Sequence, residues 1–294
     1  MSAAAQSSSF VRRRLDIVVT LGRGQFGESG TDTVTLSGLR CSAAIVKAGL
    51  DFQGQLDLRV YGMTPSLMRQ LSQLAGTPGG TRGDQVTVLA GDDASGMAIA
   101  YRGCIRDAWI DYDNAPEIAF HVFGMAALVQ ALKPVPPTSY RGSADVVTIM
   151  SNLATLMGLQ FENGGVSGVV LSNPYLPGTA YEQFERCKKA ARIDGTVDDG
   201  TLAIWPLNGS RRGVVPLISP TTGLVGYPKR TQIGVNLTSL YNLSVVIGGN
   251  VQVDSSNTPC KGMWHILTVA HTLESEIPGG QWFTALTCAA PGIV

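Results

Sequence analysis

Side chains able to do chemistry are few in this sequence and stand far apart. The three histidines are His121, His265 and His271. If residues 264–272 are extended, His265 and His271 share a face but lie about 20 Å apart at ~3.3 Å per residue, too far for one metal ion. The sequence contains no G-x-S-x-G or H-E-x-x-H motif. We therefore expect no catalytic residue, no metal site and no cofactor.

Two pairs of adjacent carboxylates, Asp92-Asp93 and Asp198-Asp199, are the remaining candidates for acid–base chemistry. Two carboxylates that meet in space can cleave a glycosidic bond, and their separation in sequence does not exclude that arrangement. Each pair, however, stands beside glycine, as turn residues do. We interpret all four as solvated turn residues, with glycan cleavage as the alternative.

A G-x-G-x-x-G motif occurs at Gly22–Gly27, directly after a predicted strand. A dinucleotide-binding loop needs a helix immediately after it, because the helix amide groups and dipole hold the phosphate. Residues 28–32 are instead turn-like and lead to another strand. We therefore expect a hairpin loop here.

The cysteines are odd in number, scattered and never arranged as C-x-x-C. This pattern indicates a reducing compartment and predicts small buried core residues, not disulfides or a zinc site. The five are Cys41, Cys104, Cys187, Cys260 and Cys288.

Charge is scarce and balanced along the chain. Charged residues make up 15% of the sequence, against roughly 25% in an average soluble protein. Residues 201–294 hold only five basic and three acidic side chains, so we expect partner subunits to cover this part. Because 22 Lys and Arg match 22 Asp and Glu, any contact with DNA is expected to be passive.

The first nine residues are small or polar, and Arg12, Arg13 and Arg14 follow shortly after them. This order differs from that of a secretory signal, and no apolar stretch approaches the ~20 residues of a membrane span. We expect a flexible N-terminus over residues 1–14 and no membrane contact.

Alternating apolar residues predict a first strand-rich domain over residues 15–132. Thr64 and Pro65 signal the start of one helix, which is predicted to end at Gly76. Many short strands around one helix favour a small tube-type β-barrel. The predicted strands are 15–21, 33–37, 39–46, 55–61, 85–90, 97–105, 108–112 and 117–123.

A proline-rich stretch at residues 132–138 marks a boundary, after which an α+β insert domain is predicted over residues 133–206. Its first helix is predicted from the N-cap Ser143 to Met157. Its second helix is predicted over 180–191, where Thr179 and Glu182 have the spacing of a capping box. The buried stripe of the first helix is expected to contain Val146, Ile149, Met150, Leu153 and Leu156.

Residues 207–294 return to strand patterns and predict a second β-barrel, with 117–125 as a strand that either barrel could hold. Its clearest feature is a hairpin of strands 264–271 and 281–287 joined through Pro278, Gly279 and Gly280. We expect Gly280 to need a positive φ, so that valine there would disrupt the hairpin.

Aromatic residues of this part are interpreted as structural. Gly226-Tyr227-Pro228 predicts a rigid, half-buried turn, with a recognition loop as the alternative. Trp205, Trp264 and Trp282 are expected to anchor the insert and the second barrel in a common core, with a ligand-stacking platform as the alternative.

Short motifs in a shared order resemble the hub proteins of contractile phage tails, the family that includes the late control D proteins. The resemblance covers most of the chain and is strongest from 140 to 291. The positions that carry it in the last third are Gly223, Gly226, Tyr227, Pro228, Pro278, Gly279, Gly280 and Trp282. Earlier pieces are the segments 140–142, 153–159, 194–195 and 200–206, and later ones are 240–242 and 271–274.

The resemblance implies a structural role in the baseplate of a virion assembled in the host cytoplasm. It implies a homotrimer whose two barrels per chain form a ring that adapts a sixfold tail tube to a threefold spike and continues the DNA channel. The implied partners are a second and third copy, the tail tube protein, the spike protein and other baseplate proteins. No spike repeat or lysozyme-like segment follows in this sequence, so those functions are expected in separate proteins.

Two functions from other classes remain open at the level of sequence. A tail-associated glycan hydrolase or esterase would use the carboxylates of the predicted turns. A carbohydrate-binding module would use a tryptophan.

Overall fold

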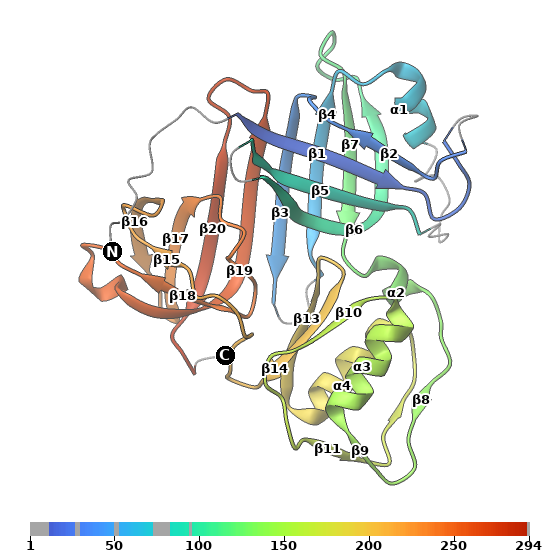
Figure 1. Ribbon diagram of the computed structural model, residues 1–294, viewed down its shortest axis with the longest axis vertical. Helices are drawn as coiled ribbons and strands as arrows, with labels where there is room; N and C mark the ends of the chain where they lie inside the picture. Colours follow the sequence, from blue (N-terminus) through green and yellow to red (C-terminus); the bar gives the residue numbers. More distant parts are fainter. Residues whose placement is uncertain (1–11, 27–29, 50–52, 73–82, 94–95, 293–294) are drawn as a thin grey trace.

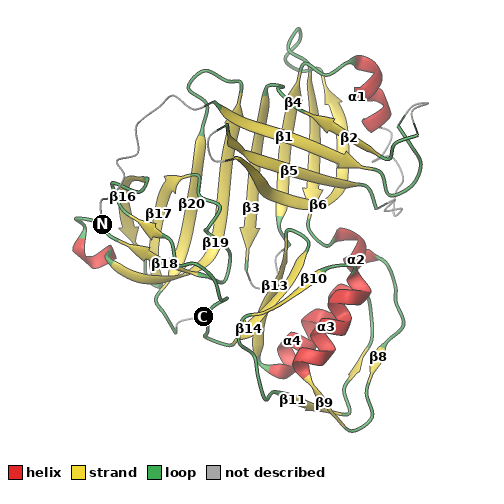
Figure 2. Ribbon diagram, viewed as in Figure 1, coloured by secondary structure: helices red, strands yellow, loops and turns green. Residues whose placement is uncertain are grey.

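The computed structural model describes residues 12–26, 30–49, 53–72, 83–93 and 96–292. It is mainly β, with one long curved sheet above a smaller α+β unit (Figures 1 and 2). The mainly β class with an α+β part is therefore confirmed.

The described residues of the first region, up to residue 132, form seven strands and two short helices. Strand β4 spans the predicted residues, whereas the two strands predicted at 97–105 and 108–112 form the single strand β6. The elements are β1 (Arg13–Thr20), β2 (Thr33–Leu36), β3 (Cys41–Ala48), β4 (Gln55–Tyr61), α1 (Pro65–Ser72), β5 (Gln85–Asp92), β6 (Gly96–Asp111), β7 (Ala119–Met125) and α2 (Leu128–Leu132). The predicted end of the first helix at Gly76 lies outside the described residues.

The α+β unit comprises β8 to β14 and carries two longer helices against a three-stranded sheet of β10, β14 and β13. Its elements are β8 (Thr138–Ser139), β9 (Ser143–Asp145), α3 (Val146–Met157), β10 (Gln160–Asn163), β11 (Val170–Ser172), β12 (Tyr175–Leu176), α4 (Ala180–Ala191), β13 (Ile193–Asp198) and β14 (Thr201–Pro206).

Both of these helices begin with a side-chain cap. The capping box of Thr179 and Glu182 is confirmed at α4, where each side chain accepts a hydrogen bond from the other residue's backbone amide. At α3 the cap is Asp145 and not Ser143, because Ser143 is already paired in β9. Leu156, which we expected in the buried stripe of α3, is exposed, and Met157 is buried in its place.

The last region returns to the long sheet. Its elements are β15 (Leu217–Ile218), β16 (Leu224–Arg230), β17 (Gly234–Leu240), β18 (Asn250–Val253), the short 3-10 helix η3 (Thr258–Cys260), β19 (Gly262–Ser275) and β20 (Trp282–Ala289). The predicted hairpin is confirmed as β19 and β20, which pair antiparallel.

The strands of the first and last regions belong to one 13-stranded sheet. Its main path runs β16-β17-β20-β19-β3-β4-β7-β6-β5-β1-β2, and β15 and β18 lie off this path. The joint is the antiparallel pair of β19 with β3, from Thr268↔Ala48 to Ser275↔Cys41. Hydrogen-bonded strand pairing is therefore continuous from the first region to the last. The division of these strands into two barrels stays a prediction.

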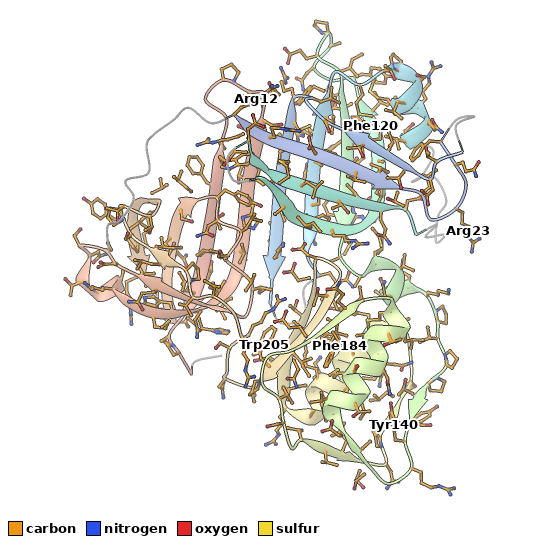
Figure 3. All side chains as sticks on the ribbon, in the orientation of Figure 1. Arg12, Arg23, Phe120, Tyr140, Phe184 and Trp205 are labelled. Atoms are coloured by element: carbon orange, nitrogen blue, oxygen red, sulfur yellow. The ribbon has the colours of Figure 1, made fainter. Side chains whose placement is uncertain are left out.

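Three hydrophobic cores underlie this arrangement. The first gathers side chains of β1 to β7 and α1, including Ile45 and Leu58. The second lies inside the α+β unit around Phe184 (Figure 3). The third lies between strands of the last region and includes Trp264 and Leu286.

A β-bulge at Leu267 reverses the faces of β19. Partners skip from Ile266↔Cys288 to Thr268↔Thr287, so one residue of β19 is unpaired. In a regular strand, Trp264 and Val269 would point to opposite faces, because they are an odd number of residues apart. With the bulge between them, both lie in the same core. Our expectation that His265 and His271 share a face is therefore wrong, because the inserted residue shifts the alternation by one.

Candidate assembly surface and buried charge cluster

The strand β16 forms one end of the long sheet and has a free edge. It pairs only with β17 among the described strands, and its residues are mostly exposed. Val225 is 39% and Tyr227 74% exposed. An unpaired strand edge that carries apolar side chains favours pairing with another chain.

The predicted half-buried turn at Gly226-Tyr227-Pro228 is wrong, because these residues lie inside β16. The strand is distorted there, since its register with β17 shifts between Val225 and Lys229. Gly226 takes φ +67°, which L-residues rarely adopt, and Pro228 is the buried member. The carbonyl of Pro228 accepts a hydrogen bond from Asn257 Nδ2 at 3.0 Å, which fixes the bulge while Tyr227 faces outward.

Gly223 and Trp282, two of the predicted motif positions, each accept a backbone hydrogen bond at the end of β17. Leu240 donates its N–H to the carbonyl of Gly223 at 2.7 Å, and Tyr241 donates to that of Trp282 at 3.0 Å. Gly223 has φ +107°, and a Cβ there would lie 3.2 Å from Leu240 Cβ. The motif thus supports the end of β17 structurally.

The turn between β19 and β20 needs both of its glycines, for different reasons. Gly279 has φ +69° and open space around its missing Cβ. Gly280 does not have a positive φ, so our conformational argument for it is wrong; a Cβ there would instead lie 3.0 Å from Glu274 Cβ. The amide after it, of Gln281, donates to Glu274 Oε2 at 2.7 Å.

The tryptophans do not share a common core, contrary to our expectation. Trp264 belongs to the core of the last region and Trp282 to that of the first. Trp205 is also buried, and its ring fills the place of a Cβ at Gly248, only 2.4 Å from that position. It therefore connects the α+β unit to the last region, as its place in Figure 3 indicates.

A second strand flank is free at β6. Strand β5 pairs with β6 only from Gly96 to Cys104, whereas β7 pairs with it up to Asp111. On the side away from β7, the stretch of β6 from Arg106 to Asp111 therefore has no strand partner among the described residues, although helix α1 contacts β6. Trp109 on this stretch is 41% exposed and stacks on His121, with ring centroids 4.1 Å apart.

Exposed apolar side chains concentrate in the region where charge is scarce. Of the large exposed hydrophobic residues, nine fall between 214 and 263: Val214, Val215, Leu217, Val225, Tyr227, Ile233, Leu240, Leu243 and Met263. A free edge, little charge and exposed apolar groups together fit a protein contact surface.

The carboxylates Asp198 and Asp199 are not solvated, which corrects our interpretation of that turn. Lys47 of β3 forms ion pairs with both, at 3.1 Å to Asp198. The side chains of Lys47, Asp198 and Asp199 are 10%, 11% and 25% exposed, so the turn is largely shielded from solvent. Arg211 lies 3.8 Å from Asp198 and binds Glu162 through two hydrogen bonds, of 2.8 and 2.6 Å.

Burial governs the pKa values in this charge cluster, which we define as Lys47, Asp198, Asp199, Arg211 and Glu162. Burial raises the pKa of Asp199 to about 6, against the opposing effect of Lys47. Burial opposes the charge of Lys47, but its two aspartate partners leave the Lys47 pKa raised. Burial, with Lys47 nearby, lowers the pKa of His271 to about 3, so this histidine is neutral at neutral pH.

In the other carboxylate pair, Asp93 agrees with an exposed turn, since its side chain is 58% exposed and pairs with Arg14, whereas Asp92 is the half-buried last residue of β5. The Gly22–Gly27 motif leads from β1 to its antiparallel partner β2, which agrees with a hairpin loop; Gly27 itself lies outside the described residues. All five cysteines are buried and free.

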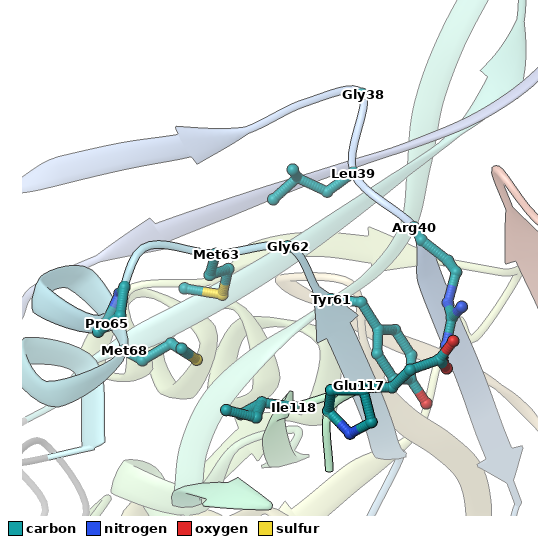
Figure 4. Close-up of a pocket in the computed structure, with 11 residues that line it drawn as sticks. Gly38, Leu39, Arg40, Tyr61, Gly62, Met63, Pro65, Met68, Glu117 and Ile118 are labelled. Atoms are coloured by element: carbon teal, nitrogen blue, oxygen red, sulfur yellow. Dashed lines mark hydrogen bonds and ion pairs between the residues drawn. The ribbon is translucent and has the colours of Figure 1, made fainter. Parts of the chain in front are cut away.

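A groove lies at one end of the first region, beside α1. Its volume is about 510 Å³, and Figure 4 shows Met63, Met68 and Ile118 around it. Arg40 closes one side, where it forms a 2.6 Å ion pair with Glu117 and stacks over Tyr61. The described residues that line the groove include no nucleophile with an adjacent base.

The part of the chain that the structure describes shows neither a metal-binding cluster nor a membrane-spanning helix. Within the described residues, no group of three His, Cys, Asp or Glu side chains could hold a metal ion. Among those same residues, no helix combines the length and apolar character needed to cross a membrane.

Comparison with known proteins identifies the fold. The chain resembles the tail protein from Neisseria meningitidis MC58 with a TM-score of 0.61 at 11% identity, over 95% of this chain and 97% of that one. It resembles the 43 kDa tail protein of prophage MuSo2 from Shewanella oneidensis with a TM-score of 0.62 at 13% identity, over 95% and 99%. The E. coli c3393 protein, a type VI secretion component, gives 0.57 at 11% identity, over 85% and 73%.

These identities are low, so the three likenesses concern the fold. A search of curated proteins found no match. The family model described as baseplate hub gp41 matches residues 14–278. Because that match spans nearly the whole sequence, the chain belongs to the baseplate hub gp41 family of structural phage tail proteins.

Proposed function

We propose that this protein is a trimeric baseplate hub, in which three copies form a ring between the tail tube and the spike. The observation that carries the proposal is the free edge of β16 in the region where charge is scarce and apolar residues are exposed. Membership of the hub family supports the same role. The ring would be a hollow adaptor, with tube-type barrels as its units and 15–132, 133–206 and 207–294 as the domains of each chain.

The two free strand flanks suggest how copies join. The edge of β16 in one copy would meet the flank of β6 from Arg106 to Asp111 in the next copy. Such a contact is head-to-tail. It closes into a ring when the rotation that relates neighbouring copies is a whole fraction of a full turn. Closing the ring would pair both exposed strand edges with a neighbouring copy, which lowers the risk of aggregation.

The remaining parts of the role concern partners and place. Tube, spike and other baseplate proteins would bind the two rims, and DNA would pass through the lumen without being gripped, since the chain carries no net charge. The protein would act in the virion after assembly in the host cytoplasm. We propose no enzymatic activity for it, because the carboxylates of the Asp198-Asp199 turn are held in ion pairs, Asp198 with Lys47 and Arg211 and Asp199 with Lys47.

The test is the mass of the purified protein by native mass spectrometry, which is expected to show a trimer. A double variant with Val225→Lys and Tyr227→Lys places two charges on the β16 edge and should yield monomers, because charges that become buried without partners are costly. The matched control is Val170→Lys with Tyr175→Lys, a similarly exposed valine and tyrosine in the α+β unit. A wild-type chain that stays monomeric at every concentration contradicts the proposal.

A further inference from the structure

The contact between the α+β unit and the long sheet rests on a buried charged turn, which the assembly role does not use. Asp198 and Asp199 stand at the β13–β14 turn and reach β3 through Lys47. Asp199 Oδ1 also accepts a hydrogen bond of 3.1 Å from the backbone amide of Arg102 in β6. This amide is available because β7 pairs with β6 only from Cys104 onward.

The charges in this cluster do not balance. Three carboxylates, of Asp198, Asp199 and Glu162, face two cations, Lys47 and Arg211. Uncompensated charge is costly in a buried place, and one bound proton would remove it.

The neighbouring titratable groups do not supply the missing positive charge. His271 of β19 is neutral, because burial and Lys47 lower its pKa. Burial raises the pKa values of Tyr101 in β6 and Tyr241 after β17, so both hydroxyls keep their protons and carry no charge. The side chain of Arg102 is exposed and packs beside Gly200, with its Cδ 3.5 Å from where that glycine's Cβ would be, and it reaches Asp199 through its backbone amide.

We propose that the Asp198-Asp199 turn is a proton-operated lock, which binds the α+β unit more tightly to the long sheet when one of its carboxylates is protonated. The contact of the unit with the last region of the chain would act as the hinge. There Trp205 packs on Gly248, and Arg211 donates its backbone N–H to the carbonyl of Gly248 at 2.6 Å.

A cavity beside the turn gives the unit room to move. Its volume is about 240 Å³, and it lies between Gly200 and Val197 of the unit and Gln85 and Cys104 of the sheet. Close packing normally excludes space of this size from a rigid contact. The proposed lock therefore lies beside a space between the α+β unit and the long sheet that side chains do not fill.

The direction of the pH effect follows from linkage. The pKa of Asp199 is about 6 in the docked state, against a reference value of 3.8. The docked state therefore holds a proton that a separated, solvated turn would release between these two pH values. Docking strengthens as pH falls through about 6 and weakens as pH rises above it.

Hydrogen exchange on the full chain tests the lock, with protection factors corrected for the intrinsic effect of pH. Protection of 193–206 and 41–48 is expected to rise about tenfold or more from pH 8 to pH 5. Asp199→Asn mimics the protonated carboxyl and should give high protection at both pH values. Asp93→Asn, in the exposed carboxylate pair, is the matched control and should follow the wild type.

A second variant tests the same device from the cationic side. Lys47→Met leaves two buried carboxylates without their main partner, so protection of the contact should fall most at pH 8. If that chain does not fold, Lys47→Arg keeps the charge and should retain the pH response. Protection that is flat or falls between pH 8 and pH 5 in the wild type, or an Asp199→Asn variant that keeps the wild-type response, overturns the proposal.

Discussion

The first and last regions of the long sheet use apolar residues in opposite ways. In the first region burial alternates along β3 and β4, and residues such as Ile45, Leu56 and Leu58 are fully buried. In the last region many large apolar residues remain exposed, Val214 and Tyr227 most of all. Both regions have a core, but large apolar residues are left exposed mainly in the last region.

Charge follows the same division. The first region carries ion pairs along its surface, such as Arg40–Glu117 and Arg106–Asp107. In the last region Lys261–Asp254 is an exposed pair, and few other charges occur there. Surface ion pairs add little stability, roughly 0–1 kcal/mol each, but they keep a surface soluble and unsuited to burial. The first region thus combines fully buried apolar residues with surface ion pairs, whereas the last region combines exposed apolar residues with few charges.

The largest effect is expected from removing a leucine in the first region. Leu58→Ala should destabilise the fold by about 2–5 kcal/mol, because the fully buried side chain leaves a cavity. Chemical denaturation measures this loss. Leu240→Ala in the last region should change monomer stability by less than ~0.5 kcal/mol and weaken association, since Leu240 is 45% exposed. Equal losses of stability in both variants would remove the contrast between the regions.

A somewhat smaller effect is expected where the α+β unit meets the last region. Gly248→Val would place a β-branched side chain in the space of the Trp205 ring and at φ +75°. Overpacking costs roughly 1–3 kcal/mol, and the backbone conformation adds to this cost. Thermal unfolding, with a shift in tryptophan fluorescence, reports the change. Gly213→Val is the control, because nothing lies within 4 Å of its missing Cβ.

The smallest effects sharpen the comparison at two turns. Gly279→Ala in the last region and Gly38→Ala in the first both place a Cβ at positive φ in open space. Each should cost about 1–2 kcal/mol. Gly280→Ala needs no unusual φ but crowds Glu274, so its cost depends on how far that side chain shifts. Denaturation midpoints compare the three; a harmless Gly279→Ala alongside a costly Gly38→Ala would show that the hairpin turn relaxes freely.

Local patterns predicted much of the secondary structure. The residues of β4, the extent of α4 and its capping box followed from alternation and from the spacing of Thr179 and Glu182. These features depend on neighbours within a few residues, so the sequence contains all that is needed. The boundary of α3 was missed because Ser143 pairs with β11, a partner 29 residues away at Ser172.

The charge cluster could not have been found from spacing. Lys47 and Asp199 are 152 residues apart, and nothing near either residue signals the other. An Asp-Asp pair next to glycine looks the same whether solvent or another core covers it, which is why Asp92-Asp93 and Asp198-Asp199 were interpreted alike. The bulge at Leu267 could not be predicted either, because one unpaired residue does not change the strand-like apolar pattern of β19.

The sequence by itself determined the strand-rich class, the two capped helices, the last hairpin and the scarcity of charge after residue 200, since these follow from residue type and short-range periodicity. Only the tertiary structure decided that β3 and β19 join both regions into one sheet, that Tyr227 faces outward from a free edge, and that the Asp198-Asp199 turn is buried. The physical reason is that burial and pairing depend on which surfaces meet across long separations, and that information is not local.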